Sequence, residues 1–153
     1  MYPLTPSRPP AALGSGSSHP AASAAQQGWI RLVAELLTSD ETRLLASIGM
    51  LGLSRGALEA SETIFAALAL ARPGAEIGPL GQGLVKLAKG DARGAAAILN
   101  AAAPSDAIYF FHAVALRGLG EEAEARDILE NLAAVAAEPI RDMARQMIEQ
   151  VEA

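Results

Sequence analysis

The sequence predicts an all-α fold, an array of helical hairpins, and two observations support this prediction. Apolar residues make up 51% of the 153-residue chain but aromatic residues only 4%, so alanine and leucine carry the hydrophobicity. This composition suits closely packed helices and disfavours a β-sandwich, which is rich in valine, threonine and aromatic residues. In addition, apolar residues recur three and four positions apart on both sides of several glycines, as in amphipathic helices joined by tight turns.

The stretch from Ala107 to Val135 contains the clearest of these hairpins. Its two halves, AIYFFHAVALRGLG and EEAEARDILENLAAV, have the spacing of two amphipathic helices around Gly120. Each helix is short and has one apolar side, so neither is expected to be stable in isolation. Further hairpins must therefore stack on this one to bury its apolar surface.

Equivalent glycines mark the other hairpins. Gly56, Gly90 and Gly120 each lie between two apolar-periodic segments and are separated by 34 and 30 residues. A small residue precedes each glycine by seven positions, a small residue follows it by five, and a large apolar residue follows it by nine. These residues are Gly49, Gly83 and Ala113; Ser61, Ala95 and Ala125; and Phe65, Leu99 and Leu129. Small residues beside large ones are what closely stacked helical hairpins require.

This pattern resembles the tetratricopeptide repeat, which has small, glycine, small and bulky residues in this order and a proline after its second helix. The corresponding prolines are Pro73, Pro104 and Pro139. The resemblance covers about Glu41 to Glu138 and implies a solenoid of about three repeats, at 41–74, 76–105 and 106–138. The aromatic residue expected early in each first helix is present only as Tyr109. The third repeat is four residues short, and we expect the missing residues to come from the linker around Pro104.

Three further segments flank the repeats. Residues 1–26 hold five of the nine prolines and a single charged residue, so a disordered tail is predicted, followed by a helical domain at 27–153. An N-terminal helix is predicted from its apolar residues: Trp29, Ile30, Val33, Leu36 and Leu37. Thr38 to Asp40 has the composition of a helix N-cap. Residues 139–152 predict an amphipathic helix that caps the array at its C-terminal end.

The composition disfavours several classes of function. The net charge is −5 and no cluster of lysine and arginine occurs, so nucleic-acid binding is not expected. Without cysteine the chain has no disulfide, no thiolate nucleophile and no cysteine zinc site. No run approaches the roughly 18 to 20 apolar residues of a membrane span. We expect a cytoplasmic protein.

The sequence also offers no constellation of catalytic or metal-binding residues. His112 lies among apolar residues, so we predict a packed histidine rather than a metal ligand or general base. The glycines at 78, 81 and 83 lack the strand and the lysine that define a phosphate-binding loop. The acids at 121, 122 and 124 suit the start of a helix. We therefore predict a protein that is not an enzyme and that has no cofactor and no metal.

The resemblance points to a surface instead. In tetratricopeptide arrays the first helix of each repeat lines a concave groove, and on this chain that register selects mostly large apolar residues. The predicted groove residues are Met50, Leu53, Ile77, Leu80, Leu84, Leu87, Phe110, Val114 and Arg117. An open apolar groove of this kind needs a cover. The cover is either an amphipathic helix of a protein partner, another part of this chain, or a second copy in a homodimer.

In size, acidity and repeat number the chain is similar to the small tetratricopeptide-type chaperones of bacterial type III secretion. Those proteins hold needle subunits or translocators before export. The resemblance implies a cytoplasmic chaperone that holds an aggregation-prone helix of a small secreted or assembly protein. The alternative is a structural scaffold or homodimeric assembly module whose groove is covered by the protein itself.

Overall fold

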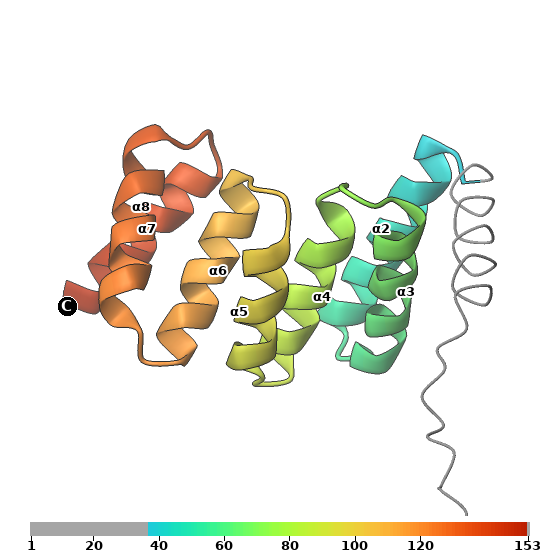
Figure 1. The fold of residues 1–153 in the computed structure, drawn as a ribbon, viewed down its shortest axis with the longest axis horizontal. Helices are drawn as coiled ribbons and strands as arrows, with labels where there is room; N and C mark the ends of the chain where they lie inside the picture. Colours follow the sequence, from blue (N-terminus) through green and yellow to red (C-terminus); the bar gives the residue numbers. More distant parts are fainter. Residues whose placement is uncertain (1–36, 153) are drawn as a thin grey trace, which may run out of the picture.

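The computed structural model describes residues 37–152, and within this range seven α-helices follow one another without any β-strand (Figure 1). The helices are α2 (Ser39–Ser54), α3 (Leu58–Ala71), α4 (Ile77–Ala88), α5 (Ala92–Ala101), α6 (Asp106–Gly118), α7 (Glu122–Val135) and α8 (Ile140–Glu152). The all-α prediction is confirmed for these residues. The predicted tail at 1–26 and the predicted helix around Trp29 lie outside the described residues.

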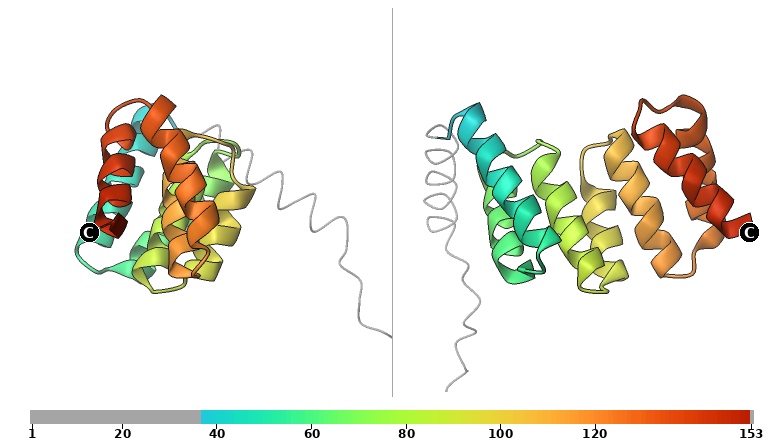
Figure 2. Two further views of the ribbon diagram at one scale, coloured as in Figure 1. Left: turned by 90° about the vertical axis from the view of Figure 1, so that its left-hand side faces the viewer. Right: turned by 180° about the vertical axis from the view of Figure 1, so that it is seen from behind.

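The helices pack consecutively in two rows. Each helix contacts the next one along the chain, and in addition α2 contacts α4, α4 contacts α6 and α6 contacts α8. Within the described range, α3, α5 and α7 contact only their neighbours in sequence. The even-numbered helices therefore form the more closely spaced, inner row. Figure 1 has the outer row toward the viewer, and the right-hand view of Figure 2 has the inner row toward the viewer.

The three hairpins α2–α3, α4–α5 and α6–α7 have the same turn. Their glycines, Gly56, Gly90 and Gly120, have φ values of 77°, 77° and 82°. The residue after each glycine donates its backbone N–H to the carbonyl five positions earlier, at 2.8, 2.8 and 3.0 Å. This closure satisfies carbonyl groups at the end of the first helix, and the left-handed backbone it needs costs glycine little. The turns explain why glycine recurs at these three positions.

Side-chain caps define where several helices begin. The Thr38 hydroxyl accepts a hydrogen bond from the Glu41 backbone N–H, and the Glu41 carboxylate accepts one from the Thr38 backbone N–H. This reciprocal capping box starts α2 at the predicted place. The Asp91 carboxylate and the Ser105 hydroxyl cap α5 and α6 in the same general way. Local sequence therefore sets these helix boundaries.

Helix α5 is the irregular member of the array. It has 10 residues, whereas α3 and α7, which occupy equivalent positions, have 14 each. The linkers that follow α3 and α5 are residues 72–76 and 102–105, and so differ by only one residue. The prediction that the linker around Pro104 accounts for the short third repeat is wrong. The missing residues come from the last turn of α5.

The first two hairpins are interlocked by Phe65 of α3. Its side chain is 0% exposed and lies between α2 and α4. A Cβ atom placed on Gly49 of α2 would be 2.8 Å from the ring, and one placed on Gly81 of α4 only 2.0 Å from it. A Cβ on Gly83 would similarly lie 2.7 Å from Leu99 of α5. These glycines are positions of close helix contact.

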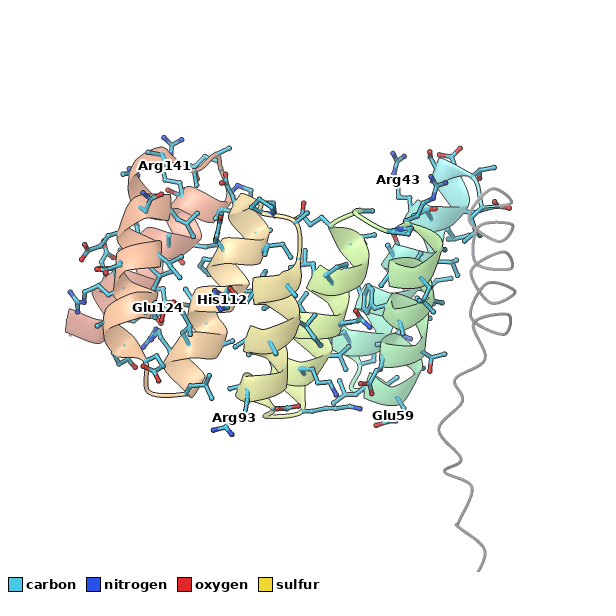
Figure 3. The ribbon with its side chains drawn as sticks, viewed as in Figure 1. Arg43, Glu59, Arg93, His112, Glu124 and Arg141 are labelled. Atoms are coloured by element: carbon cyan, nitrogen blue, oxygen red, sulfur yellow. The ribbon has the colours of Figure 1, made fainter. Side chains whose placement is uncertain are left out.

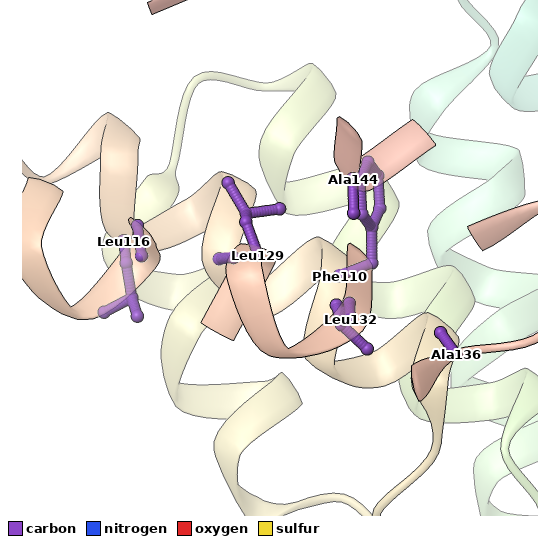
Figure 4. Close-up of a cluster of buried hydrophobic side chains, with 8 residues drawn as sticks. Phe110, Leu116, Leu129, Leu132, Ala136 and Ala144 are labelled. Carbon is purple, nitrogen blue, oxygen red and sulfur yellow. The ribbon is translucent and has the colours of Figure 1, made fainter. Parts of the chain in front are cut away.

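A second, larger core lies at the C-terminal end. Its buried members come from α6, α7, α8 and the linker before α8 (Figure 4), and they are Phe110, Ala113, Leu116, Ala125, Leu129, Leu132, Ala136 and Ala144. Helix α8 adds a stripe of partly buried residues, Ile140, Met143, Met147 and Ile148. Its polar residues, including Arg141 (Figure 3), lie away from this stripe. The predicted amphipathic C-terminal helix is thus present as α8.

Ion pairs join the first and second hairpins at the surface. Lys89, which directly follows α4, pairs with Glu59 at 2.8 Å and also with Glu62, both on α3, and Lys86 of α4 pairs with Glu62 at 3.1 Å. Glu59 is labelled in Figure 3. Hydrogen bonds from Lys89 and Lys86 lower the pKa of Glu62 below 4.5. Hydrogen bonds to Glu59 and Glu62 raise the pKa of Lys89 above 10.5.

We predict that Gly81→Ala destabilises the protein although alanine is the better helix former. The substitution gains about 1 kcal/mol of helix propensity, but the overpacking against Phe65 costs about 1–3 kcal/mol. Urea unfolding followed by circular dichroism measures the net loss. In a Phe65→Leu background the same substitution should cost less, because the smaller side chain leaves room for the methyl group. An equal loss in both backgrounds would contradict the steric explanation.

We predict that Glu62→Gln lowers the melting temperature at neutral pH and that this difference disappears in acid. Because the folded-state pKa of Glu62 is lowered, its stabilisation is complete above pH 4.5 and is lost as the pH falls through the folded-state value. Thermal unfolding from pH 7 down to pH 3 tests this. Glu149→Gln, which removes an exposed acid from α8, is the matched control and should show no such convergence.

Candidate functional site

The candidate site is the inner face, which we define as the solvent-facing side of the inner row on α2, α4 and α6. The predicted groove residues lie along these three helices. Their exposure to solvent differs, from 41% for Met50 to 3% for Phe110. The inner face therefore has two regions, one on α2 and α4 and one on α6.

The region on α2 and α4 keeps apolar side chains at the surface. Met50 is 41% exposed, and Leu80 and Leu84 are half-buried. Leu53 and Ile77 are also half-buried and pack against the core around Phe65. Leu87, the last predicted residue on these helices, is half-buried and packs against Ala95, Ala96 and Ala115. Met50, Leu80 and Leu84 are thus the members best placed to meet a partner.

The predicted groove residues on α6 make contacts with other helices of the protein. Phe110 is only 3% exposed and belongs to the C-terminal core with Ala144 of α8 (Figure 4). The prediction that Phe110 lines an open groove is therefore wrong for this structure, because α8 covers the ring. Val114 is half-buried and packs against the same core. Arg117 pairs with Glu122 of α7 at 3.4 Å.

The inner face of α4 carries no charge. The only charged residue of this helix is Lys86, and its amine pairs with Glu62 of α3 in the outer row. The charged residues of α2 are Asp40, Glu41 and Arg43, all near the start of the helix, and the exposed Arg43 (Figure 3) pairs with Asp40 at 3.8 Å. The charges of α2 are thus confined to its N-terminal end.

A recess that the sequence did not predict lies on either side of Tyr109. One part, of about 360 Å³, is lined by residues of α6 and α7 that include Asp127 and Asn131. The other part, of about 240 Å³, is lined by residues from the end of α5 to α6 that include Asn100 and His112. Tyr109 is 47% exposed between them. A sequence signal for this recess was the spacing of 30 residues between Gly90 and Gly120, against 34 between Gly56 and Gly90. The short helix α5, which accounts for this difference, ends beside the recess.

His112 and the glycines at 78, 81 and 83 lie within helices. His112 is half-buried on α6 beside the recess (Figure 3). Among residues 37–152, no three histidine, cysteine, aspartate or glutamate side chains are grouped so as to hold a metal ion. The glycines at 78, 81 and 83 lie inside helix α4. In the same range, no helix has the length and apolar character needed to cross a membrane.

Comparison with models of known families, with curated proteins and with solved structures gives no match for this chain.

We predict that Ala144→Asp uncovers the C-terminal core. Ala144 is fully buried beside Phe110, so the new carboxylate would be buried without a cation, at a cost of at least about 3 kcal/mol. The expected result is a lower melting temperature and increased binding of a hydrophobic dye. Arg145→Gln, on the neighbouring exposed position of the same helix, is the control and should behave like the parent protein. An unchanged melting temperature for Ala144→Asp would contradict the packing of α8.

Proposed function

We propose that this protein is a non-catalytic binding module that holds an amphipathic helix of a partner protein against the inner face of α2 and α4. The observation that carries the proposal is the uncharged inner side of α4, which carries the half-buried Leu80 and Leu84 and contacts α2, the helix of the exposed Met50. An apolar surface of this kind is matched by the apolar stripe of an amphipathic helix. Methionine suits such a surface because its flexible thioether side chain adapts to different partners.

The chain itself contains an example of this mode of packing. Helix α8 is amphipathic, and its apolar stripe packs against the core formed with α6 and α7. A partner helix with apolar residues at three- and four-residue spacing would make the same kind of contact further along the inner row. Each large apolar side chain that it buries contributes about 1.5–3 kcal/mol, and several are needed to offset the entropy lost on association.

We further propose that the three hairpins have tetratricopeptide geometry. Three facts support this: the identical glycine turns, the inner row of contacting first helices, and the burial of equivalent positions five and nine residues after each glycine. On this basis the partner is an aggregation-prone helix, and the role is that of a cytoplasmic chaperone of the type III secretion kind. The apolar inner face and the acidic composition are what favour that role.

The alternative function is a structural or homodimeric assembly module. It is favoured by one observation, namely that α8 already covers the part of the inner face that contains Phe110. In that case a second copy would cover Met50, Leu80 and Leu84 as well. The two functions differ in the oligomeric state of the purified protein, since the binding module is a monomer until its partner is added.

We predict that Leu84→Glu abolishes partner binding and leaves the helical content unchanged. A glutamate at this half-buried position would place a charge under the apolar stripe of the partner helix. The measurement is affinity purification of the tagged protein from its native host, with mass spectrometry of the proteins that elute. Leu70→Glu, the same substitution at an exposed position of the outer row, is the matched control and should retain the partner.

Capture of the same partner in equal amount by Leu84→Glu and by the parent protein would contradict the assignment of the inner face. A stable dimer of the parent protein in sedimentation, dissociated by Leu84→Glu and not by Leu70→Glu, would instead establish the assembly module.

A further inference from the structure

The recess beside Tyr109 lies on α6 between two helices of the outer row, α5 and α7 (Figure 1). Within the described range these two helices make no contact with each other, although both pack on α6. Tyr109 lines both parts of the recess, the one of about 360 Å³ against α7 and the one of about 240 Å³ against α5. The recess shares no residue with the part of the inner face on α2 and α4.

The internal repeat explains why this space is open. The residue twelve positions after the turn glycine is Leu68 in the first hairpin, Ala102 in the second and Leu132 in the third. Leu68 is 1% exposed in the core around Phe65, and Leu132 is 3% exposed in the C-terminal core. Ala102 instead follows the last residue of α5 and lines the recess. The second hairpin thus lacks both the helical turn and the leucine that fill this position in the other two.

Polar side chains that line the recess are free to bind a ligand. They are Asn100, Tyr109, His112, Asp127 and Asn131. None of these side chains has a hydrogen bond or an ion pair to another of residues 37–152. Each asparagine amide offers both a donor and an acceptor, which match the C=O and the N–H of a peptide group. One asparagine borders each part of the recess, so a peptide backbone that crosses Tyr109 can bond to both.

The charge of the recess favours a cation. Among the described residues, Asp127 is the only acid that lines it, and no lysine or arginine lines it. The cations of the three surrounding helices are Arg93, Arg117 and Arg126, and the last two pair with carboxylates of α7. A lysine or arginine side chain of a ligand can pair with Asp127 and also lie over the exposed ring of Tyr109, because a cation is attracted to an aromatic face.

The shape of the recess suits an extended peptide better than a small molecule. A small-molecule site encloses most of its ligand, whereas here two open parts share the wall formed by Tyr109, which is 47% exposed. In an extended chain the side chains of residues i and i+2 point to the same side, about 7 Å apart. One such side chain can therefore enter each part, with the tyrosine ring between them.

We propose that the recess binds an extended segment of a partner protein that carries a lysine or arginine two residues away from a large aliphatic residue. The cationic side chain lies against Asp127 and Tyr109, and the aliphatic side chain enters the part beside Ala102. The amides of Asn100 and Asn131 bond to the backbone of the segment. The inference is independent of the proposed function, because that function uses Met50, Leu80 and Leu84 on the inner face.

The test uses two blocked tripeptides of opposite direction, acetyl-Leu-Gly-Arg-amide and acetyl-Arg-Gly-Leu-amide, titrated into the isotope-labelled full-length protein. We expect one or both to shift the side-chain amide signals of Asn100 and Asn131 in the nuclear magnetic resonance spectrum. Peptides with glutamate in place of arginine should bind more weakly, because Asp127 repels them. Free arginine should also bind more weakly, because it lacks the aliphatic side chain and the peptide backbone.

Two variants test the residues of the recess. Ala102→Leu introduces the side chain found at the equivalent positions of the other hairpins and should abolish peptide binding without lowering the melting temperature. Ala60→Leu, at an exposed position of α3, is its control and should bind normally. Asp127→Asn keeps the shape and should weaken the arginine peptide about fivefold, as expected for loss of a partly exposed ion pair. Glu130→Gln, on the same helix but outside the recess, is the second control.

Three results would overturn the proposal. The first is an absence of shifts at Asn100 and Asn131 with both arginine peptides, or an affinity that neither Ala102→Leu nor Asp127→Asn changes. The second is binding of free arginine as tight as that of the peptides, which would indicate a small-molecule site. The third is a set of shifts centred on Met50 and Leu84, which would place the peptides on the inner face instead.

Discussion

The contact of the Phe65 ring with the glycines of α2 and α4 is the constraint on which the array depends. A single hairpin buries too little apolar surface to be stable, so each hairpin needs the next one at close range. Gly49 and Gly81 permit this range because neither has a side chain where the ring lies. The equivalent pairs along the chain are complementary in size: glycine faces phenylalanine or leucine in the first two hairpins, and alanine and leucine share the C-terminal core in the third.

The same constraint explains where apolar surface is left outside the contacts between hairpins. Packing within the array buries Phe65 and Leu68 of α3 and Ala95, Ala96 and Leu99 of α5. Surface that no neighbouring hairpin reaches must be covered in another way. At the C-terminal end α8 provides the cover, whereas at the described N-terminal end and on the inner face of α2 and α4 the apolar side chains remain at the surface.

Much of the fold was predictable because its signals are local. The left-handed turns favour glycine, the helix starts favour capping residues, and a helical spacing of apolar residues indicates an amphipathic helix. Each of these signals involves only a few neighbouring residues. The site was less predictable. Met50 and Phe110 hold the same kind of position in the register, but the first is exposed and the second is buried under α8. The recess beside Tyr109 depends on the early end of α5, which the spacing of the glycines indicated without locating it.

The sequence by itself determined the all-α class, the three glycine turns, the start of α2 and the amphipathic character of α8, since short-range backbone and side-chain preferences specify all four. Only the tertiary structure decided which apolar residues form the core and which stay at the surface. The physical reason is that a side chain is buried only if another helix packs against it. The periodicity of one helix does not specify which other helix packs there. Phe110 became a core residue and Leu44 a surface residue for this reason alone.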